Sequence, residues 1–206
     1  MVFSFSMISL WISLLLYSGS FVPQIATNYR IKSAQGMSDM FIWCYCTGYW
    51  LMLLYVFLQP FAYPYLIMVP IETGFMMVLL WQRLRYDGLK KSAVFNGAVI
   101  ASFVVVFGAL FFASSHAQLV ADIAGWGSFV AFAINPVPQL IKIYRSRTTF
   151  GFSFWFASLT AGAQILELIG GIIEKIPVPT LAMAVRGLIV YVFYCYFFAK
   201  YAPKKT

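Results

Sequence analysis

Ionisable side chains inside long apolar runs are the clearest candidates for chemistry in this sequence. Glu72, Glu167 and Arg186 each lie within a run long enough to cross a bilayer. A charged group in the middle of a membrane span costs about 3 kcal/mol, so a chain retains it only for a function or within an ion pair. We therefore consider two alternative roles for these residues. Glu72 or Glu167 takes up and releases protons, or one of them forms a fixed ion pair with Arg186.

Four uncharged residues, together with Arg186, have side chains suited to bind a small polar solute. Gln164 and Asn135 offer amide groups within apolar runs, and Asn28 lies near a proline in the first run. For both asparagines, hydrogen bonds to helix backbone near the proline are the alternative. Trp50 lies deep in its run, whereas tryptophans that anchor a protein at the membrane interface lie near run ends. These residues are predicted to contact the solute.

The sequence offers little for catalysis or metal binding. Its three cysteines, Cys44, Cys46 and Cys195, are an odd number within apolar runs, which fits neither a disulfide framework nor a zinc site. The only histidine is His116, in a polar connection, so no nucleophile has a base beside it and no cluster has metal-ligand spacing. We expect no enzyme activity, no catalytic residue, no metal and no cofactor.

Composition places the chain in a lipid bilayer. The 206 residues are 62% hydrophobic and only 10% charged, whereas about 25% of a soluble domain is charged. The net charge of +8 therefore concerns the membrane surface, and nucleic acid is not an expected partner.

Seven apolar runs predict seven transmembrane helices, at 3–29, 40–58, 62–82, 94–113, 119–144, 153–173 and 178–199. Twelve of the fourteen basic residues fall in alternate connections or at the C-terminal end. By the positive-inside rule, these connections and the C-terminus are cytoplasmic, and the N-terminus is outside or lumenal. The twelve are Arg30, Lys32, Arg83, Arg85, Lys90, Lys91, Lys142, Arg145, Arg147, Lys200, Lys204 and Lys205.

One motif occurs twice at an offset of 115 residues. Pro23-Gln24 is followed by Tyr-Arg and then Gly36-x-Ser, and Pro138-Gln139 is followed by the same residues up to Gly151-x-Ser. Repetition in register over so long a stretch indicates two copies of one structural unit. Pro23 and Pro138 lie inside the first and fifth runs, which we therefore expect to kink or break there.

The repeat predicts a domain organisation. Residues 1–92 form a first three-helix unit, 93–115 a connector helix, and 116–206 a second three-helix unit, an all-α 3+1+3 membrane protein. Because the offset spans four helices, both units cross the membrane in the same direction, related by an axis along the membrane normal. At this offset Arg186 corresponds to Ile71, so Arg186 and Glu72 could face each other across the axis.

The doubled Pro-Gln, Tyr-Arg and Gly-x-Ser pattern resembles the PQ-loop family, which includes cystinosin and lysosomal cationic amino-acid exporters and is related in fold to the SWEET sugar transporters. The resemblance covers essentially the whole chain. It implies that Pro23-Gln24 and Pro138-Gln139 are hinges for alternating access. Two differences from relatives are visible: Thr160 stands where cystinosin-like proteins carry an acidic residue, and the third and seventh runs lack the asparagines of the sugar transporters.

We therefore expect a secondary transporter of a small polar solute, an amino acid first and with possible proton coupling. A SWEET-like sugar facilitator is the alternative among transporters. A sorting receptor resembling the KDEL receptor, or an accessory protein that transports nothing, are alternatives of other classes. The sequence does not decide the substrate, the coupling ion, the organelle or the oligomeric state.

Overall fold

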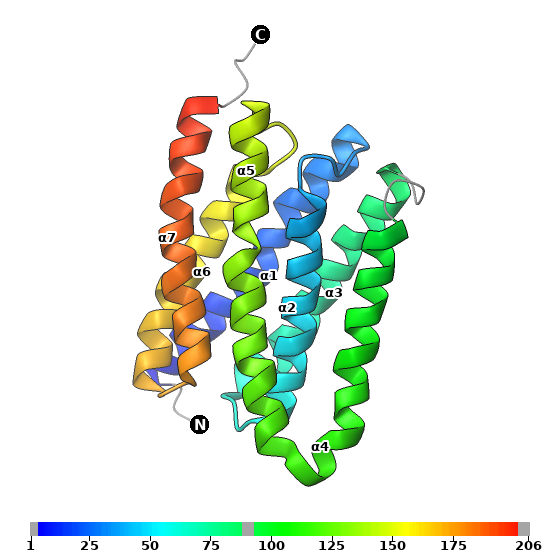
Figure 1. The fold of residues 1–206 in the computed structure, drawn as a ribbon. Coiled ribbons are helices and arrows are strands. Elements are labelled where there is room, and N and C mark those ends of the chain that lie inside the picture. Colours follow the sequence, from blue (N-terminus) through cyan, green and yellow to red (C-terminus); the bar gives the residue numbers. More distant parts are fainter. Residues whose placement is uncertain (1–3, 88–92, 202–206) are drawn as a thin grey trace.

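The computed structural model describes residues 4–87 and 93–201, and these residues form helices and short turns without a strand (Figure 1). The helices are α1 (Phe5–Ile31), α2 (Asp39–Leu58), α3 (Tyr63–Asp87), α4 (Ala93–Ile134), α5 (Pro136–Ser146), α6 (Phe154–Ile173) and α7 (Val178–Tyr201). They run up and down in an elongated bundle, with the N-terminus and the C-terminus at opposite ends.

Helix boundaries follow from capping residues that recur in both repeats. Ser38 and Ser153 accept hydrogen bonds at Oγ from backbone N–H groups three residues later, so each serine starts its helix, α2 or α6. At the preceding helix ends, Lys32 and Arg147 adopt left-handed backbone angles that stop the helical hydrogen-bond pattern. Both pairs are related by the offset of 115 residues, so equivalent positions turn the chain in the same way.

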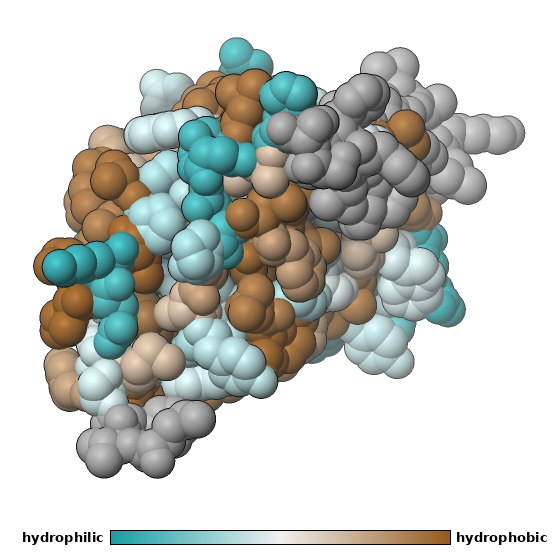
Figure 2. Space-filling model, turned by 90° about the horizontal axis from the view of Figure 1, so that it is seen from below, coloured by the Kyte–Doolittle hydropathy of each residue, from teal (hydrophilic) through white to brown (hydrophobic). Residues whose placement is uncertain are grey.

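Within the described residues, six helices are long and apolar enough to cross a membrane: Phe5–Ile31, Asp39–Leu58, Tyr63–Asp87, His116–Ser146, Phe154–Ile173 and Val178–Tyr201. Large apolar side chains such as Leu15, Ile67 and Val192 are exposed on their outer faces. Viewed from below, brown apolar groups reach the outline of the molecule, with paler and polar groups between them (Figure 2). Water does not favour so much apolar surface, whereas lipid tails do. The chain is a multi-pass integral membrane protein.

The turn between the connector and the fifth run lies at His116, in the polar connection predicted there. Its backbone (φ −139°, ψ 37°) is not helical, and α4 contains the predicted connector and most of the fifth run. A helix boundary lies at Asn135, whose backbone angles are themselves helical, directly before Pro136, and Pro138 lies within α5. α1 continues as one helix through Pro23. That residues 93–115 cross the membrane, which would complete the 3+1+3 topology, stays a prediction.

The two repeats have matching helices in a shared arrangement. α2 and α6 are related residue for residue by the offset of 115. α3 packs against both α1 and α2, and α7 packs against α6 and against α4 and α5, so the third helix of each repeat lies between the other two. Between the repeats, α1 packs on α6 and α2 packs on α4. A Cβ on Gly170 would lie 2.8 Å from the Ser6 carbonyl oxygen, so glycine permits the close α1–α6 packing.

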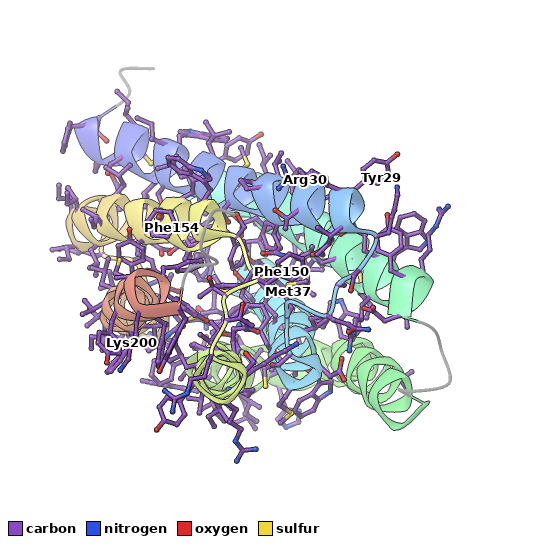
Figure 3. All side chains as sticks on the ribbon, turned by 90° about the horizontal axis from the view of Figure 1, so that it is seen from above. Tyr29, Arg30, Met37, Phe150, Phe154 and Lys200 are labelled. Carbon is purple, nitrogen blue, oxygen red and sulfur yellow. The ribbon has the colours of Figure 1, made fainter. Side chains whose placement is uncertain are left out.

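The described basic residues, apart from Lys175 and Arg186, gather where α1, α3, α5 and α7 end, which we call the basic end. Seen from above, Arg30 ends α1, Lys200 ends α7, and Met37 and Phe150 approach each other near the centre (Figure 3). The two halves of this end are held differently. Arg83 forms ion pairs with Asp39 and Asp87, both at 2.5 Å, whereas the equivalents of Arg83 and Asp39 are two rings, Phe198 and Phe154, 5.1 Å apart.

Lys90, Lys91, Lys204 and Lys205 lie outside the described residues. That the basic end faces the cytoplasm stays a prediction from the distribution of charge.

Candidate functional site

A cavity of about 110 Å³ lies between the two repeats. Both repeats form its wall: Tyr49 from α2 and Glu72 from α3 on one side, and Gln164 from α6 and Arg186 from α7 on the other. The structure thus brings four helices and most of the predicted polar residues to one space. Asn135, at the interruption between α4 and α5, also lines it.

The cavity wall carries an unusual set of unsatisfied polar groups. In the described part of the chain, buried polar atoms with no hydrogen-bond partner are found on six residues that line the cavity. Leaving such an atom unpaired costs about 1–3 kcal/mol, and more when the group is charged. The atoms are Oε1 of Glu72, Nδ2 of Asn135, Oε1 of Gln164, Oγ1 of Thr180, Nε of Arg186 and the hydroxyl oxygen of Tyr194. The wall therefore offers donors and acceptors to a ligand.

Arg186 and Glu72 are the charged members of this set. Within the described residues, the ion pairs are those of Arg83, so Arg186 is paired with neither Glu72 nor Glu167 in this structure. The ion pair considered from the sequence is therefore absent. Tyr17, Tyr45 and Tyr194 are the charged or titratable neighbours of the Arg186 guanidinium.

Glu167 differs from Glu72 in having a hydrogen-bond partner at both oxygens. Its Oε2 accepts a hydrogen bond from the hydroxyl of Tyr17 at 2.7 Å, and its Oε1 accepts one from the hydroxyl of Tyr65, also at 2.7 Å. The side chain is buried, with 5% of the residue exposed. Because Glu167 belongs to the second repeat and both tyrosines to the first, these bonds also join the repeats.

Gly187 positions Gln164 next to Arg186. A Cβ at Gly187 would lie 1.7 Å from Nε2 of Gln164, so the amide lies directly against the α7 backbone. Only glycine leaves room for it there. Gln164 and Arg186 thereby present polar groups side by side to the cavity.

Two predicted solute-binding residues lie elsewhere. Asn28 is fully buried, accepts a hydrogen bond from Gln24 at 2.9 Å and donates one to Gln82 at 3.0 Å. It does not line the cavity. Trp50 is buried among the helices and also lies outside the cavity wall. Their placement favours structural roles for both.

The two Pro-Gln glutamines clamp the loops of the opposite repeat. Gln24 donates from Nε2 to the Gly151 carbonyl (2.9 Å), and its Oε1 accepts from the Ser153 N–H (2.8 Å). Gln139 does the same with the Gly36 carbonyl (3.0 Å) and the Ser38 N–H (2.8 Å). Both amides are fully buried. We call these four bonds the glutamine clamp.

At the clamp, the two glycine loops touch. A Cβ on Gly36 would lie 2.1 Å from the carbonyl carbon of Gly151, and Gly151 itself has a positive φ of 78°. Next to the loops, the rings of Phe41 and Phe156, equivalent residues of the two repeats, are 6.3 Å apart in an edge-to-face arrangement. The clamp, the glycines and the rings lie together at the basic end, and the two rings form part of the cavity wall.

Sequence reasoning missed several functional residues. Tyr17, Tyr49 and Tyr65 line the cavity, but tyrosine is common in membrane spans and their partners are distant in sequence. Ser38 and Ser153 were noted only as part of the repeated motif, and their N–H groups hold the clamp. The available signal was the repeat itself, because a side chain repeated in register serves the interface that the repeats share. The described residues contain no group of three or more His, Cys, Asp or Glu that could hold a metal ion.

Comparison with protein families gives the same division of the chain. The family model for the PQ loop repeat matches residues 5–65 and again residues 120–180, more than half of the sequence. The chain belongs to the PQ-loop repeat family. The two matches are separated by the same 115 residues as the motif, and each covers the first two helices of a repeat. Comparison with curated proteins found no match.

Proposed function

We propose that this PQ-loop repeat protein is a secondary transporter of a small polar solute, an amino acid, that works by alternating access. One observation carries the proposal: the cavity between the repeats presents to one small volume an unpaired oxygen of Glu72, Oε1, and an unpaired nitrogen of Arg186, Nε, with no ion pair between the two side chains. An internal cavity on the axis between parallel repeats is where such transporters bind their substrate.

The charges favour a zwitterion. A buried charged group without a partner is costly, and a ligand that supplies the opposite charge relieves this cost. An α-ammonium group would neutralise Glu72, and an α-carboxylate would neutralise Arg186 and accept hydrogen bonds from its guanidinium. A sugar brings no charge and would leave both groups uncompensated. We therefore prefer an amino acid to a sugar.

Alternating access requires each end to open in turn. In the proposed cycle, the glutamine clamp keeps the basic end closed, and the cavity opens there when the clamp separates. The chain interruption at Asn135 and the prolines at 23, 136 and 138 give the first helix of each repeat places to bend. In this proposal seven helices cross the membrane, the N-terminus is outside, and Glu72 or Glu167 couples transport to protons.

Uptake into proteoliposomes tests the proposal. Purified protein is reconstituted and offered pools of labelled amino acids and, separately, sugars, with and without an imposed pH gradient. We expect amino acid uptake, and accumulation that collapses with the gradient if protons are coupled. Uptake of sugars alone would make the protein a facilitator of sugars. Tight binding without flux of any pool would refute transport and favour a receptor.

A further inference from the structure

We infer that the site selects neutral amino acids with apolar side chains and discriminates against cationic ones, and that Glu167 with its two tyrosines sets this selectivity. The inference rests on the proposed function, because it concerns which amino acid enters the same cavity. It depends on which charged groups in the cavity wall still have atoms without a hydrogen-bond partner in the protein.

Glu167 is not free. Its two oxygens already accept hydrogen bonds from Tyr17 and Tyr65, each at 2.7 Å, and the residue is buried. An ammonium group could reach this carboxylate only by displacing a tyrosine. The two hydroxyl donors thus stabilise a negative charge that the cavity does not offer to a substrate.

Glu72 differs from Glu167 in keeping one oxygen free, although Tyr49 and Ser18 also hydrogen-bond to Glu72, and Arg186 keeps one nitrogen free. Oε1 of Glu72 and Nε of Arg186 are buried in the cavity wall without a partner. One carboxylate and one guanidinium match one ammonium and one carboxylate, which are the two charges common to all amino acids. A second ammonium, as in a lysine side chain, would find no free carboxylate.

Beside the polar groups of Asn135, Gln164 and Thr180, part of the wall is apolar and aromatic. Val69, Phe132, Phe156 and Met183 line this part. A hydrocarbon or aromatic side chain gains from burial there. Ring faces attract a cation, but they do not replace the full negative charge that a buried ammonium requires.

Competition and substitution test the selectivity. In proteoliposomes, labelled leucine and labelled lysine are offered at equal concentration, and unlabelled lysine is also added as a competitor of leucine uptake. We expect leucine uptake about tenfold above lysine uptake in the parent, and weak competition by lysine. The double variant Tyr17→Phe with Tyr65→Phe removes both hydrogen bonds to Glu167. The carboxylate is then available to a substrate ammonium group, so the ratio of lysine to leucine uptake should rise about tenfold.

Two further variants isolate the cause. Adding Glu167→Gln to the double variant should return the ratio to the parent value, because the exposed charge is removed. Tyr191→Phe is the matched control: Tyr191 lines the same cavity, but its hydroxyl pairs with Ser158 at 3.2 Å, so its loss should leave the ratio unchanged. Thermal stability of each variant is measured alongside uptake.

The outcomes separate this inference from the proposed function. Lysine uptake equal to or above leucine uptake in the parent, or strong competition by lysine, overturns the selectivity while amino acid transport stands. An unchanged ratio in the folded double variant overturns the role of Glu167. No uptake of either amino acid in the parent, nor of any other in the pools, refutes the proposed function itself.

Discussion

Replacing Gly36 by alanine is the sharpest test of how the basic end closes. The new Cβ would lie 2.1 Å from the Gly151 carbonyl carbon, against an ordinary contact of 3.4 Å or more. The two loops would have to separate by about 1.3 Å, the difference between these distances. The obstacle is backbone, so a rotamer change cannot relieve it. We expect Gly36→Ala to hold the basic end open.

The size of the effect follows from the glutamine clamp. Separation of the loops stretches its four hydrogen bonds. Each contributes about 1 kcal/mol net, so the closed state loses about 4 kcal/mol in total. Because 1.4 kcal/mol is a factor of ten, the population of the closed state falls by up to about a thousandfold. A transporter that cannot close one end should lose at least about 90% of its uptake.

The assay combines uptake with access to the cavity. Thr160, which lines the cavity, is replaced by cysteine in a variant without the three native cysteines. A membrane-impermeant maleimide is then applied from the side of the basic end. We expect Gly36→Ala to accelerate labelling and to abolish uptake.

Gly19→Ala is the control, since a Cβ there meets nothing within 4 Å. If Gly36→Ala folds but labels and transports like Gly19→Ala, the reasoning that glycine contact closes this end is wrong.

Three other predictions follow from the site and the clamp. Gly187→Ala should displace Gln164, because the new Cβ lies 1.7 Å from its Nε2. We expect about a tenfold higher KM for uptake. Gly74→Ala is the control and should leave KM unchanged, because a Cβ there meets nothing within 4 Å. Glu72→Gln should lower kcat/KM for a zwitterion at least about tenfold, since the ammonium loses its counter-charge; equal kinetics for the parent and this variant would contradict the assignment. Gln24→Ala should be less stable than Gln139→Ala by about 1 kcal/mol in thermal unfolding, because Gln24 also bonds buried Asn28; equal melting temperatures would argue against this bond.

Local features of the sequence predicted much of the fold. The offset of 115 residues predicted equivalent helices, and α2 and α6 obey it residue for residue. The serine of each repeated Gly-x-Ser motif lies at a helix start, where its Oγ accepts a backbone N–H bond as serine caps do. These predictions succeeded because capping and apolar length depend on neighbours a few residues apart.

Which helices pack against each other could not be predicted from local features of the sequence. α3 lies between α1 and α2, and α1 packs on α6 of the other repeat, yet helices that are apolar on all sides show no face that predicts this order. The helix boundary at Asn135 lies just before Pro138, where a kink or break was predicted, and Pro136 as the first residue of α5 fits a helix start. The two tyrosines that hydrogen-bond to Glu167 lie 102 and 150 residues away from it in the sequence. A local sequence pattern cannot predict contacts over such separations.

The glutamine clamp has a consequence for how the two halves have diverged. Each glutamine recognises a carbonyl and an N–H of the opposite loop, so closure depends on main-chain groups and little on the neighbouring side chains. After a duplication, the rest of each half was therefore free to change. At equivalent positions of the cavity, Glu72 stands opposite Gly187, and Tyr65 opposite Thr180. Under the proposed function, two identical halves would present identical groups to both ends of a substrate, whereas two divergent halves would let the site distinguish an amine from a carboxylate.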